Sequence, residues 1–166
     1  MTPLTVTPLT ADDLPAAAAL ESACFSDPWT EAGLEMLLRF PYAGLCARLS
    51  GAVVGYVGYS SLPAEGNCPA EAEITRIAVL PDARRRGIGR ALLDAMIAAC
   101  PGAEIHLDVR VSNTAARALY ADAGFLPVGR RPRFYGDEDA LEYCRPARPA
   151  PNGDSDDDRS RKERLC

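Results

Sequence analysis

One short segment constrains the fold of this chain more than any other. An apolar run at residues 77–80 leads through a loop at Pro81 to Arg-x-x-Gly-x-Gly and a helical pattern that continues to residue 93. Glycines let the backbone approach an anion closely, and the N-terminus of a helix presents unpaired amides to it. The segment therefore predicts an α/β unit that binds a phosphate-bearing cofactor.

The spacing of this motif excludes two common phosphate-binding loops. A P-loop ends in Gly-Lys-Ser/Thr, and a dinucleotide-binding loop requires a third glycine where this chain has Leu92. Arg84, Gly87 and Gly89 instead resemble the acyl-coenzyme-A loop of the GNAT superfamily of N-acetyltransferases. Taken alone, such a motif is more often a solvated arginine-rich turn.

A second segment, residues 107–125, strengthens the resemblance. It predicts a strand end, a turn at Asn113, an amphipathic helix and a helix stop at Gly124. The order Asn-x-x-Ala-x-x-Leu-Tyr-x-x-x-Gly-Phe is similar to that of GNAT enzymes. In that family the asparagine lies at the cofactor and the tyrosine, here Tyr120, lies at the thiol.

Length and composition bound the class of protein. At 166 residues, 48% hydrophobic and 25% charged, the chain is expected to form one globular catalytic domain. Its apolar runs are too short for a membrane span and its first residues lack signal-peptide features, so we expect a cytoplasmic protein. Six scattered cysteines and one histidine give no metal-ligand spacing, and we expect no metal.

Charge separates a domain from a tail. Residues 1–145 carry the whole net charge of −5, which argues against direct nucleic-acid binding and suits a cationic acceptor, although solubility alone explains it equally well. Residues 146–166 are rich in proline and charge, with almost no apolar residue to offset the entropy of ordering. We expect the tail to be disordered.

The predicted elements alternate in a mixed α/β order. Helices are expected at residues 11–23, 30–39, 87–99 and 113–123, and strands at 3–8, 43–49, 52–61, 72–79, 104–109, 125–129 and 140–144. This order resembles the GNAT fold. The resemblance implies a central twisted mixed sheet of about seven strands flanked by about four helices, within residues 1–145.

The resemblance assigns the acyl-coenzyme-A site to two groups of residues. The backbone of the strand would bind the pantetheine arm, and loop amides would bind the diphosphate, with Asn113 as a further cofactor contact or a simple helix cap. The residues assigned in this way are Ile77, Ala78, Val79, Arg84, Arg85, Arg86, Gly87, Ile88, Gly89, Arg90 and Asn113.

Acetyl transfer also needs a proton donor and a proton acceptor. Tyr120 is the expected donor to the coenzyme-A thiolate, unless it is only a core residue. The base is left open between Glu73, which shares a strand face with Glu71, and Asp108. Glu73 faces the acceptor if Ile77 does too. Asp108 stands where a subfamily usually has a glutamate. Its side chain is one methylene shorter, so a water molecule can bridge the gap between its carboxylate and the amine.

Three further stretches resemble the ribosomal-protein-alanine N-acetyltransferase (RimI) group. Residues 21–30 match Glu-x-x-x-Phe-x-x-Pro-Trp-Ser/Thr, residues 107–113 are similar to Leu-Glu-Val-Arg-x-Ser-Asn, and residues 131–141 are similar to Arg-x-x-Tyr-Tyr…Glu-Asp-Ala. The resemblance implies peptide contacts at Trp29, Tyr135 and Glu138, although core packing explains Trp29 equally well.

The leading hypothesis is direct acetylation, in a ternary complex, of the N-terminal alanine of a small-subunit ribosomal protein by a monomer or weak dimer. A covalent enzyme intermediate is not expected, because His106 accompanies no cysteine in a nucleophile motif. The alternative acceptors are a small amine or a lysine side chain. A third hypothesis is a catalytically silent protein that only binds acyl-coenzyme A.

Overall fold

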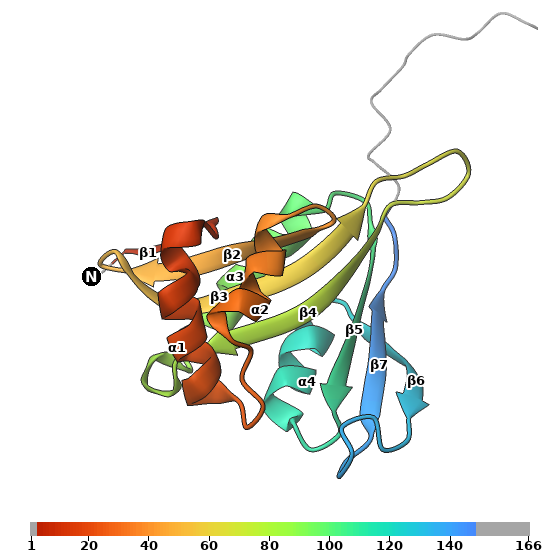
Figure 1. Ribbon diagram of the computed structural model, residues 1–166. Helices are drawn as coiled ribbons and strands as arrows, with labels where there is room; N and C mark the ends of the chain where they lie inside the picture. The colour runs from red at the N-terminus through yellow and green to blue at the C-terminus, as the bar shows by residue number, and fades with distance from the viewer. Residues whose placement is uncertain (1–2, 149–166) are drawn as a thin grey trace, which may run out of the picture.

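The computed structural model describes residues 3–148, in which one twisted sheet is the central layer (Figure 1). Its seven strands have the order β1-β2-β3-β4-β5-β7-β6, and every neighbouring pair is antiparallel except β4 and β5. The strands are β1 (Leu4–Pro8), β2 (Tyr42–Leu49), β3 (Ala52–Leu62), β4 (Glu71–Val79), β5 (Glu104–Arg110), β6 (Leu126–Arg131) and β7 (Ala140–Arg145). The predicted mixed sheet is confirmed.

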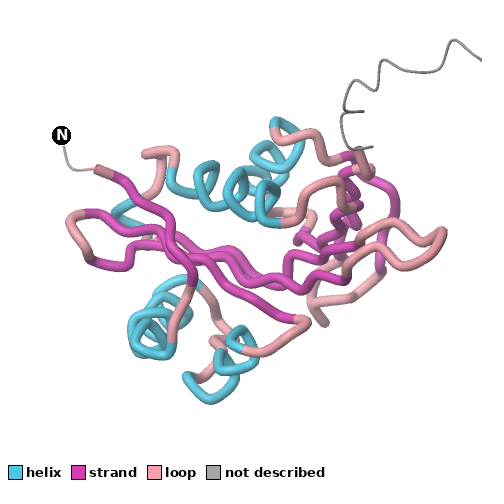
Figure 2. The backbone as a smooth tube through the Cα atoms, turned by 90° about the horizontal axis from the view of Figure 1, so that it is seen from above, coloured by secondary structure: helices cyan, strands magenta, loops and turns pink. Residues whose placement is uncertain are grey.

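Helices cover both faces of this sheet, as the view from above shows (Figure 2). One face carries α1 (Leu14–Cys24) and α2 (Glu31–Leu34), and the other carries α3 (Ile88–Ala99) and α4 (Thr114–Asp122). Apolar side chains between the sheet and each helix pair form two core clusters, one on each face. The four predicted helices are all present.

The helix expected at residues 30–39 is only partly α-helical. Thr30 caps its start, because its hydroxyl accepts a hydrogen bond from the amide of Gly33 at 3.1 Å. The α-helical hydrogen bonds end at Leu34, however, and a 3-10 helix follows at Glu35–Leu38. Leu34 and Leu37 are both buried, and their three-residue spacing is the one a 3-10 helix places on a single face.

A β-bulge at Thr75 separates the two parallel strands. Tyr59 of β3 pairs with Ile74 and Gly58 pairs with Arg76, which leaves Thr75 as an extra residue on β4. The pairing of β4 with β5 ends at the same place, since Ile74 and Leu107 are their last partners. Beyond this point β4 and β5 diverge and leave one edge of β4 open.

The described residues contain no helix that combines the length and apolar character needed to cross a membrane.

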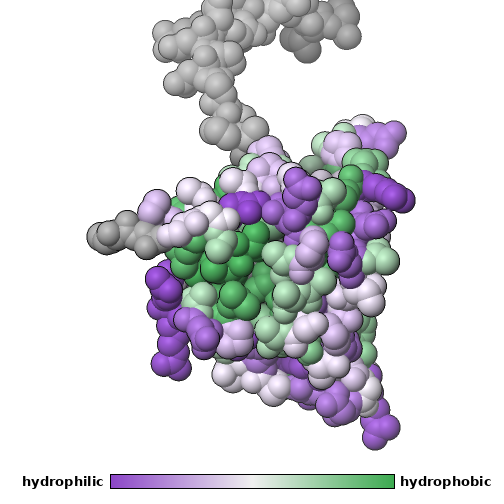
Figure 3. Space-filling view, turned by 60° about the vertical axis from the view of Figure 1, so that its left-hand side comes forward, coloured by the Kyte–Doolittle hydropathy of each residue, from purple (hydrophilic) through white to green (hydrophobic). Residues whose placement is uncertain are grey.

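On the face shown in Figure 3, apolar side chains gather in one area near the start of β1, and polar side chains occupy much of the remainder. The expectation of a disordered tail at residues 146–166 lies outside the described residues, apart from 146–148.

Candidate active site

A cleft of about 650 Å³ opens where β4 and β5 diverge. Residues of both strands line it, together with the α1–α2 loop, the first turns of α4 and the β6–β7 loop. A smaller groove of about 280 Å³ adjoins it and shares Glu73, Leu107 and Asp108 with it. The structure thus brings Glu73, Ile77, Asp108, Asn113, Tyr120 and Tyr135 to one cleft, as the sequence predicts.

Asp108 lies at the junction of the cleft and the groove. Its side chain is only 18% exposed, and its Oδ1 atom is buried with no hydrogen-bond donor among the described residues. Burial raises the pKa of Asp108, while Arg131, with Nε 3.4 Å from Oδ1, opposes the rise and Glu142 adds to it. A carboxylate in this state has a lone pair free to accept a proton.

Glu73 also lines the cleft, but the prediction that it shares a strand face with Ile77 is wrong. Simple alternation puts Glu73 and Ile77 on one face of β4. The extra residue Thr75 reverses the alternation, so Ile77 packs in the core on the α3 side while Glu73 lies with Arg76 on the α1 side. Glu73 is exposed, whereas Asp108 is largely buried.

Tyr120 enters the cleft from the opposite face of the sheet. It is 4% exposed, and its ring packs against Phe125 and Tyr143 at centroid distances of 5.7 and 6.4 Å. Burial raises the pKa of its phenol, so the group stays protonated at neutral pH. The core and donor readings of Tyr120 are therefore compatible, because the divergent strands let a core residue line the cleft.

The start of α3 has the features of an anion site. Gly87 precedes the helix with a φ of +77°, and a Cβ built there meets no atom within 4 Å. The first helical amide with an acceptor is that of Ala91, which donates to the Gly87 carbonyl at 3.0 Å. The preceding amides of Ile88, Gly89 and Arg90 thus project from the helix end, as an anion requires.

Two arginine side chains of this loop have partners within the protein. Arg84 donates to the Val79 carbonyl at 3.1 Å, and Arg90 pairs with Asp94 at 2.8 Å. Ile88 is buried in the core, and a Cβ at Gly89 would lie 3.4 Å from Leu119 on α4. Arg85 and Arg86 are exposed, so they remain available to a ligand together with the loop backbone.

Asn113 is the helix cap that one of its two predicted readings describes. Its Oδ1 caps α4 by accepting from the amide of Ala116 at 3.2 Å, and the residue also lines the cleft. The cap fixes the first turn of α4, and the same helix carries Tyr120.

A buried ion pair that sequence reasoning missed holds the α1–α2 loop over β4. Glu21 is fully buried and accepts hydrogen bonds from Arg76, the Tyr56 hydroxyl and the Trp29 amide. The guanidinium of Arg76 lies 4.0 Å from the centroid of the Phe25 ring and 4.8 Å from that of Trp29. The available sequence signal was Arg76, a charged residue directly before the apolar run at residues 77–80.

Trp29, a predicted peptide contact, is not among the residues that line the cleft. It is half-buried and packs beside the core cluster of the α1 face. Phe25 lines the cleft in its place. Core packing, the alternative reading of Trp29, therefore describes its position.

The β6–β7 loop closes the other side of the cleft. Tyr135 and Phe134 line it, and the Arg110 guanidinium lies 4.2 Å from the Tyr135 ring centroid. Glu138, a predicted peptide contact, does not line the cleft: its carboxylate accepts from the amide and hydroxyl of Ser112 at 2.6 and 2.9 Å. Glu138 thus ties this loop to the β5–α4 turn.

Comparisons with known proteins agree with this geometry. The model of the acetyltransferase (GNAT) family matches residues 14–125. The N-alpha-acetyltransferase RimI of Mycobacterium tuberculosis is 41% identical over 80% of this chain and 85% of its own length. The [ribosomal protein bS18]-alanine N-acetyltransferase of Escherichia coli is 32% identical over 86% of this chain and 97% of its own.

A solved structure shows the same architecture. The crystal structure of the ribosomal-protein-S18-alanine N-acetyltransferase from Escherichia coli superposes with a TM-score of 0.80 at 31% identity, and the match covers 90% of this chain and 97% of that one.

Proposed function

Because this chain belongs to the acetyltransferase (GNAT) family and is an acetyl-CoA-dependent N-acetyltransferase, we propose that it acetylates the N-terminal alanine of a ribosomal protein. The reaction takes place in the cleft between β4 and β5. One observation carries the proposal. The divergence of the strands exposes Asp108 and Tyr120, which come from opposite faces of the sheet, to one cavity.

Acetyl-CoA fits the open elements of this site. In the proposal, the diphosphate binds the backbone amides at residues 85–90, and the pantetheine arm lies along the free edge of β4 beyond Ile74. The positive φ of Gly87 and the empty space around it support this placement, since they leave the backbone accessible.

The proposed chemistry is direct transfer. The α-amino nitrogen of the peptide attacks the thioester carbonyl carbon and gives its proton to Asp108, directly or through one water. The carbon–sulfur bond then breaks, and Tyr120 donates its proton to the departing thiolate. Burial, and an Oδ1 atom that accepts no hydrogen bond, favour Asp108 over the exposed Glu73 as the base.

The acceptor assignment rests on the relatives. Proteins named as N-acetyltransferases of the alanine of ribosomal protein S18 match nearly the whole domain of this chain. Tyr135, which lines the cleft, is the proposed contact for the incoming peptide. A cytoplasmic location belongs to the same proposal, because ribosomal proteins are made there.

A peptide panel tests the acceptor. The full chain is incubated with acetyl-CoA and peptides that share an internal lysine and differ only in the first residue, and the products are located by tandem mass spectrometry. We expect acetyl groups on the α-nitrogen, fastest for alanine. Acetylation of the lysine alone, or of a small amine in preference to every peptide, would refute the proposal.

A further inference from the structure

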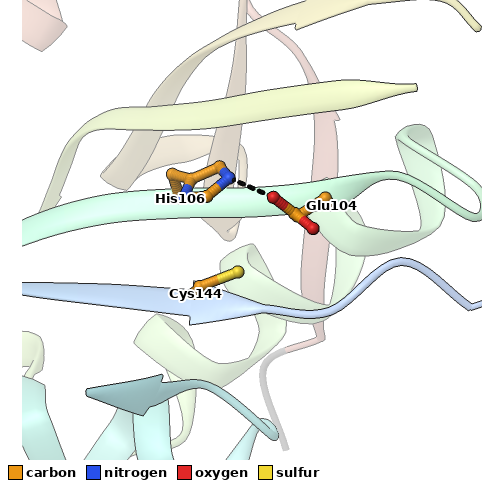
Figure 4. A group of neighbouring side chains, drawn as sticks. All are labelled: Glu104, His106 and Cys144. Atoms are coloured by element: carbon orange, nitrogen blue, oxygen red, sulfur yellow. Dashed lines mark hydrogen bonds and ion pairs between the residues drawn. The ribbon is translucent and has the colours of Figure 1, made fainter. Parts of the chain in front are cut away.

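A second cluster of reactive side chains lies outside the cleft, at the start of β5. Glu104 and His106 are two residues apart on this strand and point to one face, and Cys144 of β7 is the direct cross-strand partner of His106. Figure 4 shows His106 and Glu104 joined by a hydrogen bond of 2.7 Å, with Cys144 on the adjacent strand. One ligand atom of each residue lies within 4.8 Å of the other two.

We propose that Glu104, His106 and Cys144 form a site for a divalent transition-metal ion, with Zn²⁺ as the preferred ion. A thiolate sulfur, an imidazole nitrogen and a carboxylate oxygen are the three donor types that Zn²⁺ takes in proteins. Three protein ligands leave the fourth tetrahedral position to water. The sulfur donor disfavours Mg²⁺ and Ca²⁺, which take oxygen ligands.

The required geometry is close to the observed one. Zinc–nitrogen distances of about 2.0 Å and zinc–sulfur distances of about 2.3 Å place tetrahedral ligand atoms roughly 3.3–3.7 Å apart. The donors must therefore approach by about 1 Å from the observed maximum. The side chains of His106 and Glu104 are 46% and 38% exposed, so they can rotate, while strand pairing keeps all three backbones in register.

Sequence spacing gives no sign of this site. The expectation of no metal rested on the lack of close cysteine and histidine pairs, and Cys144 is 38 residues beyond His106 in the chain. The antiparallel pairing of β5 with β7 brings them together. Binding would release the thiol proton to solvent.

Cobalt(II) provides a direct test, since a cobalt–thiolate bond gives a charge-transfer band in the near ultraviolet. The full chain is titrated with Co²⁺ in the presence of a reductant that does not bind metals, and Zn²⁺ is then added to displace it. We expect the band in the unmodified chain and in the control Cys68→Ser, which removes an exposed thiol. The variant Cys144→Ser should lose it.

A second variant separates binding from folding. His106 is exposed, so His106→Asn should keep the native circular dichroism and weaken Zn²⁺ binding at least about tenfold. A missing band in the unmodified chain, a band that persists in Cys144→Ser, or Zn²⁺ affinity unchanged in His106→Asn would overturn the proposal. These readouts need no catalytic turnover, so they test the metal site independently of the acetyltransferase assignment.

Discussion

At the scale of residues, the site depends on two groups held in contrasting environments. Asp108 is an acid whose burial raises its pKa, and Tyr120 is a phenol whose burial keeps it protonated. The site thus places a carboxyl group that can accept a proton near a phenol that still holds its own. Burial is the reason that the pKa values of both groups differ from those of the same groups at the surface.

The hydroxyl of Tyr120 can be tested by removing it alone. Tyr120→Phe keeps the ring contacts with Phe125 and Tyr143 but cannot protonate the thiolate. We expect kcat to fall by about 10²–10⁴ while the dissociation constant of acetyl-CoA stays unchanged. Steady-state kinetics and calorimetry measure the two quantities. Turnover within a factor of two of the unmodified chain would rule out the donor role.

The base is identified by the pH dependence of kcat/KM. With Asp108 as the base, activity falls as the pH falls through its raised pKa, so the acidic limb lies above the ordinary range of an aspartate. Asp108→Asn should abolish this limb along with most of the activity, and Glu73→Gln should retain it. The reverse result would assign the proton to Glu73.

The same pKa shift predicts a gain in stability for Asp108→Asn. The folded state binds the proton more tightly than the unfolded state, so the stability that this proton confers is present at low pH and is lost as the pH rises through the folded pKa. At pH 7 a neutral asparagine removes the cost of burying the charge. Thermal unfolding at pH 7 should give a Tm equal to or above that of the unmodified chain; a marked drop would contradict this account.

At the scale of elements, the sequence predicted the seven strands and the four α-helices in their order, but not the 3-10 helix at Glu35–Leu38. Those predictions succeeded because apolar periodicity and punctuating prolines and glycines act locally. The bulge at Thr75 could not be predicted, since it depends on how β3 pairs with β4. For the same reason the roles of Glu21, Arg76 and Glu138 required the structure: each depends on partners distant in the sequence.

The backbone of the α3 entry can be tested with matched glycine variants. Gly87→Ala and Gly51→Ala place a Cβ at φ values of +77° and +83° with no neighbour within 4 Å, so each costs about 1–2 kcal/mol of unfolding free energy. Only Gly87→Ala puts its methyl group where the diphosphate is proposed to bind. Calorimetry should show a loss of acetyl-CoA affinity in Gly87→Ala alone; equal affinities would contradict the proposed placement.

The buried ion pair predicts a large stability difference between two arginines. Arg76→Ala leaves the fully buried Glu21 without its cation and should lower the free energy of unfolding by about 3–5 kcal/mol. Arg90→Ala removes an exposed pair with Asp94 and should cost less than about 1 kcal/mol. Urea denaturation measures both. Similar values for the two variants would show that the Arg76 network does not hold the loop.

At the scale of the whole molecule, the cleft exists because a mixed sheet is interrupted at its one parallel pair. Antiparallel partners hold β4 to β3 and β5 to β7 along their lengths, and the sheet opens where the parallel pairing of β4 with β5 ends. The opening joins the two faces of the sheet, and residues of α1 and α4, which lie on opposite faces, contribute to one cavity. Function thus follows from topology as much as from single residues.

The most direct test is a crystal structure of the chain with a bisubstrate compound, in which coenzyme A is joined through an acetyl group to the α-nitrogen of a peptide that begins with alanine. The account predicts the diphosphate on the backbone amides of residues 85–90, the pantetheine arm along β4, and the linking group between Asp108 and Tyr120. A compound bound elsewhere, or with its peptide remote from Asp108, would contradict it.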